Sequence, residues 1–127
     1  MKKILGVLLT VAALGTMLAG CGKDAQTETK KVYNVGIVQL TQHAALDAAT
    51  EGFKQALIDK LGEENVKFDE QNASGEATVC TTIVNSFISK KVDLIMANAT
   101  PALQAAYNAT STIPILGTSV TEYGVAL

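Results

Sequence analysis

The feature that most constrains this chain is an apolar run that passes without a break into a helical pattern. Residues 32–40 read VYNVGIVQL, a short run rich in β-branched side chains that is typical of a strand buried on both faces. Residues 41–43 are polar, and from Ala44 onward apolar residues recur at helical spacing. A strand that leads directly into a helix, and does so repeatedly, predicts an α/β fold with a parallel sheet.

The strand–helix pattern continues almost to the end of the sequence. We expect helices at about residues 44–61, 76–91 and 100–108, and further strands at residues 66–71, 92–97 and 113–117. The apolar run at 92–97 predicts a central strand, whereas the alternation of apolar and polar residues at 66–71 predicts a strand near the sheet edge. Right-handed crossovers then favour the strand order 2-1-3-4, with helices on both faces.

The N-terminus has the pattern of a secretion signal. Two lysines precede an uncharged, mostly apolar run at residues 4–19, which is shorter than the roughly 20 residues that span a bilayer. We therefore expect a lipoprotein signal peptide at residues 1–20. An uncleaved transmembrane anchor is the alternative interpretation.

The two cysteines have separate explanations. Cys21 ends the sequence LAGC, which resembles the lipobox of bacterial lipoproteins and implies cleavage before Cys21 and lipid on its sulfur. Residues 22–31 are polar and lack an apolar period, so we expect residues 21–31 to be the lipidated cysteine and a flexible tether. Cys80 lies on an apolar helical face, where cysteine usually acts as a small buried hydrophobe, and no flanking charge indicates a reactive thiolate.

Composition and motifs argue against several classes of function. The net charge of −2 and the 5% aromatic content give neither the basic surface nor the stacking platform of a nucleic-acid binder. His43 is the only histidine and has no partner at metal-ligand spacing, so we expect no metal. The sequence has no glycine-rich phosphate loop and no nucleophile elbow, so we expect no cofactor and no catalytic residue.

Small, polar and uncharged residues follow each of the expected strands. These residues lie at positions 41–43, 72–74, 98–100 and 118–121. The carboxyl ends of parallel strands share one edge of the sheet, where ligands bind, and helix N-termini there favour anionic or zwitterionic solutes. Thr100 followed by Pro101 predicts a helix N-cap and first helical residue, and capping alone is one explanation for Thr100. Ordinary turn chemistry is the corresponding explanation for Asn72 and Ser74.

The sequence resembles one family of substrate-binding lipoproteins of ABC importers, which includes binders of aromatic amino acids. The resemblance rests on residues 35–49 with 51–53, and it continues through residues 72–75, 92–95, 99–102, 113–115 and 118–123. The family usually has proline where Ala44 stands, and many relatives have aspartate and proline in place of Glu122 and Tyr123.

This resemblance implies two α/β lobes that hold the ligand in a cleft between them. Residues 32–127 would then be an incomplete first lobe, in which the expected sheet has an unpaired edge. Leu116, Val120, Val125 and Leu127 would lack a covering helix in that lobe. The positions implied to line its side of the cleft are Gln42, His43, Asn72, Ala73, Thr100, Pro101, Ser119 and Thr121.

The function implied by the resemblance is capture of an amino acid or similar small solute for an ABC permease. The protein would act, without catalysis, from a lipid anchor on the extracytoplasmic side of a bacterial membrane. A flavodoxin-like enzyme or signalling module is the alternative function. A natural single-lobe protein that completes its sheet by dimerising is the alternative to a fragment.

Overall fold

The structure is a computed structural model and describes residues 30–127. The expected signal peptide, the lipidation site at Cys21 and most of the expected tether lie outside the described residues.

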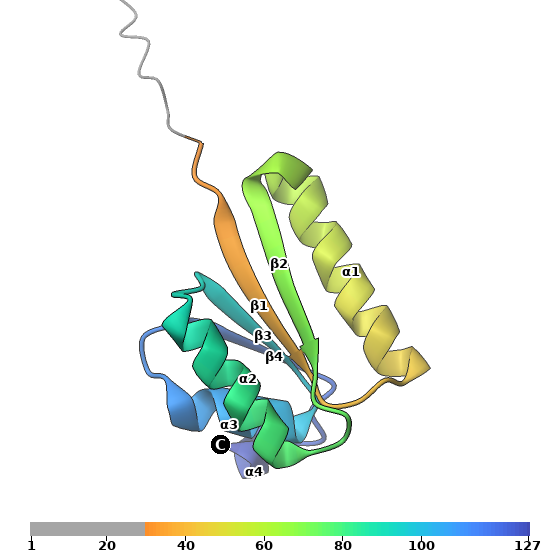
Figure 1. Cartoon of the computed structure of the whole chain (residues 1–127). Helices are drawn as coiled ribbons and strands as arrows, with labels where there is room; N and C mark the ends of the chain where they lie inside the picture. The colour runs from red at the N-terminus through yellow and green to blue at the C-terminus, as the bar shows by residue number, and fades with distance from the viewer. Residues whose placement is uncertain (1–29) are drawn as a thin grey trace, which may run out of the picture.

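Parallel strands and helices alternate along the described chain (Figure 1). The strands are β1 (Tyr33–Gln39), β2 (Val66–Asn72), β3 (Leu94–Asn98) and β4 (Ile115–Thr118); the helices are α1 (Ala44–Leu61), η1 (Glu63–Asn65), α2 (Ala77–Ser89), α3 (Thr100–Ala109) and α4 (Tyr123–Ala126). The four strands are all parallel and stand in the order β2-β1-β3-β4. The predicted α/β fold and strand order 2-1-3-4 are therefore confirmed.

The strand register brings the carboxyl ends of the strands level with one another. Gln39, the last residue of β1, lies opposite Asn72 of β2 and Asn98 of β3. Asn98 in turn lies opposite Thr118, the last residue of β4. All four strand-to-helix connections therefore leave the sheet along one line.

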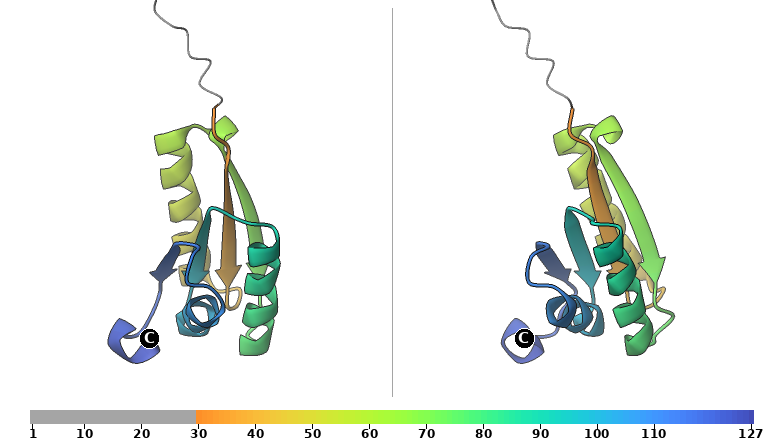
Figure 2. Two further views of the ribbon diagram at one scale, coloured as in Figure 1. Left: turned by 90° about the vertical axis from the view of Figure 1, so that its left-hand side faces the viewer. Right: turned by 60° about the vertical axis from the view of Figure 1, so that its left-hand side comes forward.

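Helices cover both faces of the sheet, as predicted: α1 lies on one face, and α2 and α3 on the other (Figure 2). Successive residues of a strand point to opposite faces, so β1 contributes to both layers. Val35 and Ile37 belong to the core under α1, whereas Val38 belongs to the core under α2 and α3.

Gly36 allows α2 to pack closely against the sheet. A β-carbon at Gly36 would lie 2.6 Å from the ring of Phe87, which is fully buried in α2. Any larger residue at position 36 would have to push the ring away. The lone glycine within the β1 sequence is thus explained by packing.

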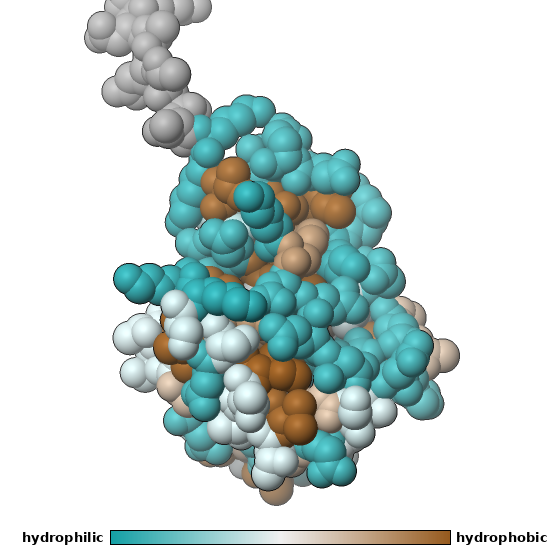
Figure 3. All heavy atoms as spheres, viewed as in Figure 1, coloured by the Kyte–Doolittle hydropathy of each residue, from teal (hydrophilic) through white to brown (hydrophobic). Residues whose placement is uncertain are grey.

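One apolar residue of α2 is more exposed than the sequence pattern predicts. Val79 belongs to the apolar stripe of α2, yet it is 38% exposed, and the surface over α2 is weakly polar to apolar (Figure 3). Leu116, Val125 and Leu127 are exposed, whereas Val120 is half-buried against the core under α2 and α3. Within residues 30–127, no helix is both long enough and apolar enough to cross a membrane.

Candidate functional site

Backbone hydrogen bonds join the loops at the carboxyl ends of the strands, which we call the carboxyl edge. The Ala73 N–H donates to the Gln39 carbonyl at 2.8 Å, and the Leu40 N–H donates to the Asn98 carbonyl at 3.2 Å. The Ala99 N–H donates to the Thr118 carbonyl at 3.0 Å. The polar loops that the sequence predicted at this edge therefore form one connected surface.

Three of these loops contain a non-glycine residue with a positive φ angle. The residues are Ser74 (54°), Ala99 (97°) and Ser119 (55°). Such backbone is uncommon for residues with a side chain and gathers at ligand-binding sites, where the surrounding structure holds it in place. The backbone at these three residues is thus in an unfavourable conformation, which the surrounding structure of the carboxyl edge holds in place.

The larger hollow at this edge, the β1–β2 hollow, has a volume of about 630 Å³ and only polar residues in its lining. Its lining residues are Gln39, Thr41, Gln42, Asp47, Glu70, Asn72 and Ser74. Two of the residues predicted for the site, Gln42 and Asn72, are among them. The side-chain oxygen of Asn72 accepts the Ser74 N–H at 2.8 Å, which is the turn chemistry considered for this residue.

A second hollow, the α3–α4 hollow, has a volume of about 310 Å³ and lies at the start of α3. Two more residues predicted for the site, Thr100 and Thr121, line it. The Thr121 N–H donates to the Thr100 hydroxyl at 3.3 Å, so the chain after β4 is held against α3.

The prediction that Thr100 is the N-cap of its helix is wrong. Ala99 is the N-cap, no side chain caps the helix, and Thr100 is the first residue of α3. The reason is that the chain turns at Ala99, whose φ is 97° and whose N–H still pairs with Thr118 of β4. Thr100 is therefore already helical, and its hydroxyl is directed to Thr121.

The other predicted site residues lie at the carboxyl edge but line neither hollow. His43 caps α1, because its Nδ1 accepts the Ala45 N–H at 3.2 Å. Ala73 is fully buried, and its carbonyl accepts the Glu76 N–H. Pro101 is half-buried in α3, and Ser119 is exposed after β4.

A set of hydrogen-bonded polar side chains, the Gln39 network (Gln39, Asp47, Thr50 and Asn98), joins two residues of the hollow lining, Gln39 and Asp47, to the buried residues Thr50 and Asn98. The Gln39 amide nitrogen donates to Asp47 at 2.6 Å, and its oxygen accepts the Thr50 hydroxyl at 2.7 Å. The Asn98 amide nitrogen donates to Thr50 at 3.0 Å and to the Leu46 carbonyl at 2.8 Å. These bonds hold the start of α1 against the ends of β1 and β3.

Sequence reasoning missed the Gln39 network and the two acids in the hollow, Asp47 and Glu70. One signal was present: Gln39 and Asn98 are amides at or next to the end of apolar runs that predict buried strands. A buried amide needs hydrogen-bond partners, so each position called for polar neighbours.

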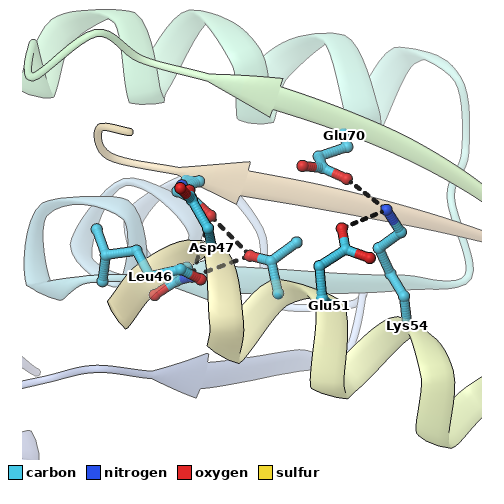
Figure 4. Close-up of polar contacts among 8 residues, drawn as sticks. Leu46, Asp47, Glu51, Lys54 and Glu70 are labelled. Atoms are coloured by element: carbon cyan, nitrogen blue, oxygen red, sulfur yellow. Dashed lines mark hydrogen bonds and ion pairs between the residues drawn. The ribbon is translucent and has the colours of Figure 1, made fainter. Parts of the chain in front are cut away.

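Lys54 of α1 pairs with two acidic residues, Glu51 of α1 and Glu70 of β2 (Figure 4). Its ammonium lies 2.9 Å from a carboxylate oxygen of Glu51 and 2.9 Å from one of Glu70. These bonds, first that to Glu51 and then that to Glu70, raise the pKa of Lys54. Among the described residues, Asp47 has no such cationic partner within 4 Å.

Cys80 is fully buried in α2, which confirms the prediction that it belongs to the core. Burial raises the pKa of its thiol, so the reactive thiolate is disfavoured. Residues 30–127 contain no group of three or more histidine, cysteine, aspartate or glutamate side chains placed to hold a metal ion.

Comparison with known proteins identifies the family. Residues 34–126 match the family model for ABC transporter substrate binding proteins. The chain belongs to this family of ABC transporter substrate-binding proteins. The family membership that the sequence resemblance predicted is thereby confirmed.

Similar proteins of this substrate-binding family are known in sequence and in structure. The chain is 42% identical to a tyrosine-binding protein of Clostridioides difficile (strain R20291), over 95% of this chain and 38% of that protein. It is 44% identical, with a TM-score of 0.72, to the ligand-free, open structure of a Clostridium difficile substrate-binding protein with adhesive properties, over 75% of this chain and 33% of that one. It is 26% identical, with a TM-score of 0.71, to an ABC domain in complex with L-Trp from Streptococcus pneumonia, over 76% of this chain and 33% of that one. The chain thus spans well under half the length of these relatives.

Proposed function

We propose that the protein captures an amino acid outside the cell and delivers it to an ABC permease, without converting it chemically. The observation that carries this proposal is membership of the substrate-binding family over residues 34–126. The relative named a tyrosine-binding protein and the solved structure with L-Trp favour an aromatic amino acid.

The carboxyl edge has the chemistry that a zwitterion needs. The N-terminus of α3, beside the α3–α4 hollow, lies next to the end of β1, because the Leu40 N–H donates to the Asn98 carbonyl, and its free N–H groups and helix dipole favour a carboxylate. The β1–β2 hollow adds neutral donors and acceptors together with Asp47 and Glu70. The predicted residues that line these hollows, namely Gln42, Asn72, Thr100 and Thr121, are the proposed contacts.

Tight binding would need a second wall opposite this edge. Sites for small ligands usually bury 70–90% of the ligand surface, and both hollows described above are open. We therefore propose that residues 32–127 form part of a first lobe. The opposite wall would correspond to the part of the relatives that this chain does not span.

The N-terminal sequence supports a place of action outside the cell, at the membrane surface. Residues 1–20 have the order of a signal peptide, and the LAGC sequence resembles a lipobox that ends at Cys21. Lipid on Cys21 would hold the protein on the extracytoplasmic face of the membrane, beside the permease.

A thermal-shift screen of the twenty amino acids on the complete protein tests this proposal. Ligands that bind the native state raise the melting temperature by mass action. We expect tyrosine or tryptophan to give the largest rise. A screen in which no amino acid shifts the melting temperature at millimolar concentration would contradict the proposal.

A further inference from the structure

We infer that Asp47 contacts a positively charged group of the bound solute, and that Gln39, Thr50 and Asn98 position its carboxylate in the wall of the β1–β2 hollow. This inference rests on the proposed function and deepens it, because it assigns the ammonium group of an amino acid to this hollow.

Asp47 has no cationic partner in the described part of the chain, whereas Glu51 and Glu70 share one. Glu51 and Glu70 each lie 2.9 Å from the Lys54 ammonium. Asp47 is half-buried and, among residues 30–127, has no lysine within 4 Å. A partly buried carboxylate without a counter-ion is unfavourable, so a cationic ligand would gain from this position.

The carboxylate of Asp47 is held in a fixed orientation. Its Oδ1 accepts the Gln39 amide N–H at 2.6 Å, and no hydrogen bond to its second oxygen is found in the described part of the chain. A carboxylate only accepts hydrogen bonds, so the nitrogen of the Gln39 amide must face it. The same nitrogen donates to the Thr41 carbonyl at 2.9 Å, which fixes a second group of the hollow wall.

The residues behind Gln39 are buried enough to make this orientation rigid. Gln39, Thr50 and Asn98 are 4%, 1% and 0% exposed. The Gln39 oxygen accepts from the Thr50 hydroxyl at 2.7 Å and from the Asn98 amide at 3.3 Å. Buried networks of this kind fix one geometry, because each donor lost would leave a buried group unsatisfied.

The position of Asp47 in the first turn of α1 does not by itself explain this arrangement. The helix dipole favours an acid there, but an exposed carboxylate would satisfy the dipole equally well. The structure instead brings three buried residues to bear on the orientation of one carboxylate that faces a hollow. Such support is what a binding group needs to hold a ligand without reorganisation.

The test compares Asp47→Asn with Glu51→Gln in the complete protein, with L-tyrosine and L-tryptophan titrated by calorimetry. Both changes remove one negative charge from the same face of α1, one turn apart. We expect Asp47→Asn to weaken binding by about 10- to 100-fold, the range for loss of a charge-assisted contact. Glu51→Gln should change it by less than twofold. Equal affinity of wild type and Asp47→Asn would overturn the inference.

An analogue without the ammonium group separates a contact from a structural effect. We expect 3-(4-hydroxyphenyl)propionate to bind Asp47→Asn at least as well as it binds the wild type. A variant that loses as much affinity for this analogue as for L-tyrosine would show that Asp47 only shapes the hollow, which would overturn the inference.

A double variant tests the positioning role of the network. If Gln39 acts through Asp47, Gln39→Met should weaken L-tyrosine binding in the wild type and have no further effect in Asp47→Asn. Thr50→Val, which keeps the side-chain shape, should behave in the same way if Gln39→Met does not fold. Additive losses would overturn the positioning role. A wild-type protein that binds no amino acid would contradict the proposed function itself. An Asp47→Asn variant that binds L-tyrosine as tightly as the wild type does would contradict this inference alone.

Discussion

Gly36 controls how closely α2 approaches the sheet, and it shows how one residue can fix a layer of the fold. The position has no side chain, and the ring of Phe87 occupies the space where a β-carbon would be. The ring itself is fully buried, so it has no open side to move into.

We predict that Gly36→Ala destabilises the protein by about 1–3 kcal/mol, the usual cost of overpacking a core. The matched control is Gly52→Ala in α1, where a β-carbon would meet nothing within 4 Å. That change should be stabilising by roughly 0.5–1 kcal/mol, because alanine favours a helix over glycine. Urea unfolding measures both, and a Gly36→Ala variant as stable as the wild type would refute this account of the packing.

At the scale of single residues, the sequence predicted burial correctly where burial depends on hydrophobicity alone. Cys80 is in the core as predicted, because an apolar helical stripe faces the sheet. Thr100 was misassigned because capping propensity says nothing about the strand pairing that turns the chain at Ala99. Val79 belongs to the right stripe but lies at its exposed margin, which periodicity does not resolve.

An ion pair joins β2 to the residue that directly follows α2. The Lys90 ammonium donates to the Asp69 carboxylate, and this bond is the main reason that the pKa of Asp69 lies below its ordinary value. A carboxyl whose pKa is lowered by folding stabilises the fold above its unfolded pKa, near 4. This contribution disappears as the pH falls through the folded pKa.

We therefore predict that Asp69→Asn lowers stability at pH 7 and makes the acid-induced loss below about pH 4 shallower. The effect should be about 0.5 kcal/mol, because both side chains are partly exposed to solvent. Lys90→Gln removes the other partner and should reproduce both changes. Unfolding by urea at pH 7 and pH 3 measures them, and an unchanged pH dependence in both variants would contradict the assignment.

Long elements were predictable and short ones were not. Helix α1 covers residues 44–61 as predicted, because it has a clear apolar period and is followed by Gly62 at a φ of 88°. The single-turn helices η1 and α4 carry too few residues to show a period. The Gln39 network was missed because it depends on the register that places Gln39 beside Asn98, and apolar patterns do not set register between parallel strands.

At the scale of the whole molecule, β4 and the residues in and after α4 carry apolar side chains that no described element covers. Leu116, Val125 and Leu127 are 46%, 77% and 55% exposed. The chain matches only 33% to 38% of the length of its relatives. Both observations support the proposal that residues 32–127 form one part of a larger receptor.

The proposed membrane anchor makes a separate prediction for the whole protein. Cys21→Ala should prevent lipid attachment and cleavage, so labelled lipid should no longer be incorporated into the protein. Mass spectrometry of the wild-type N-terminus should show a lipidated Cys21 as the first residue. An unmodified Cys21 within an intact N-terminus would instead support the uncleaved-anchor interpretation.

The measurement that tests the central claim most directly is a ¹H–¹⁵N spectrum of the complete protein, recorded during titration with L-tyrosine. The account places the solute at the carboxyl edge, so amides in residues 41–43, 72–75, 99–101 and 118–121 should shift most. Amides near Lys91 and Asp93, which precede β3 at the opposite edge, should stay where they are. A titration that moves the amides of the opposite edge, or moves none in this lobe at saturating L-tyrosine, would contradict the account.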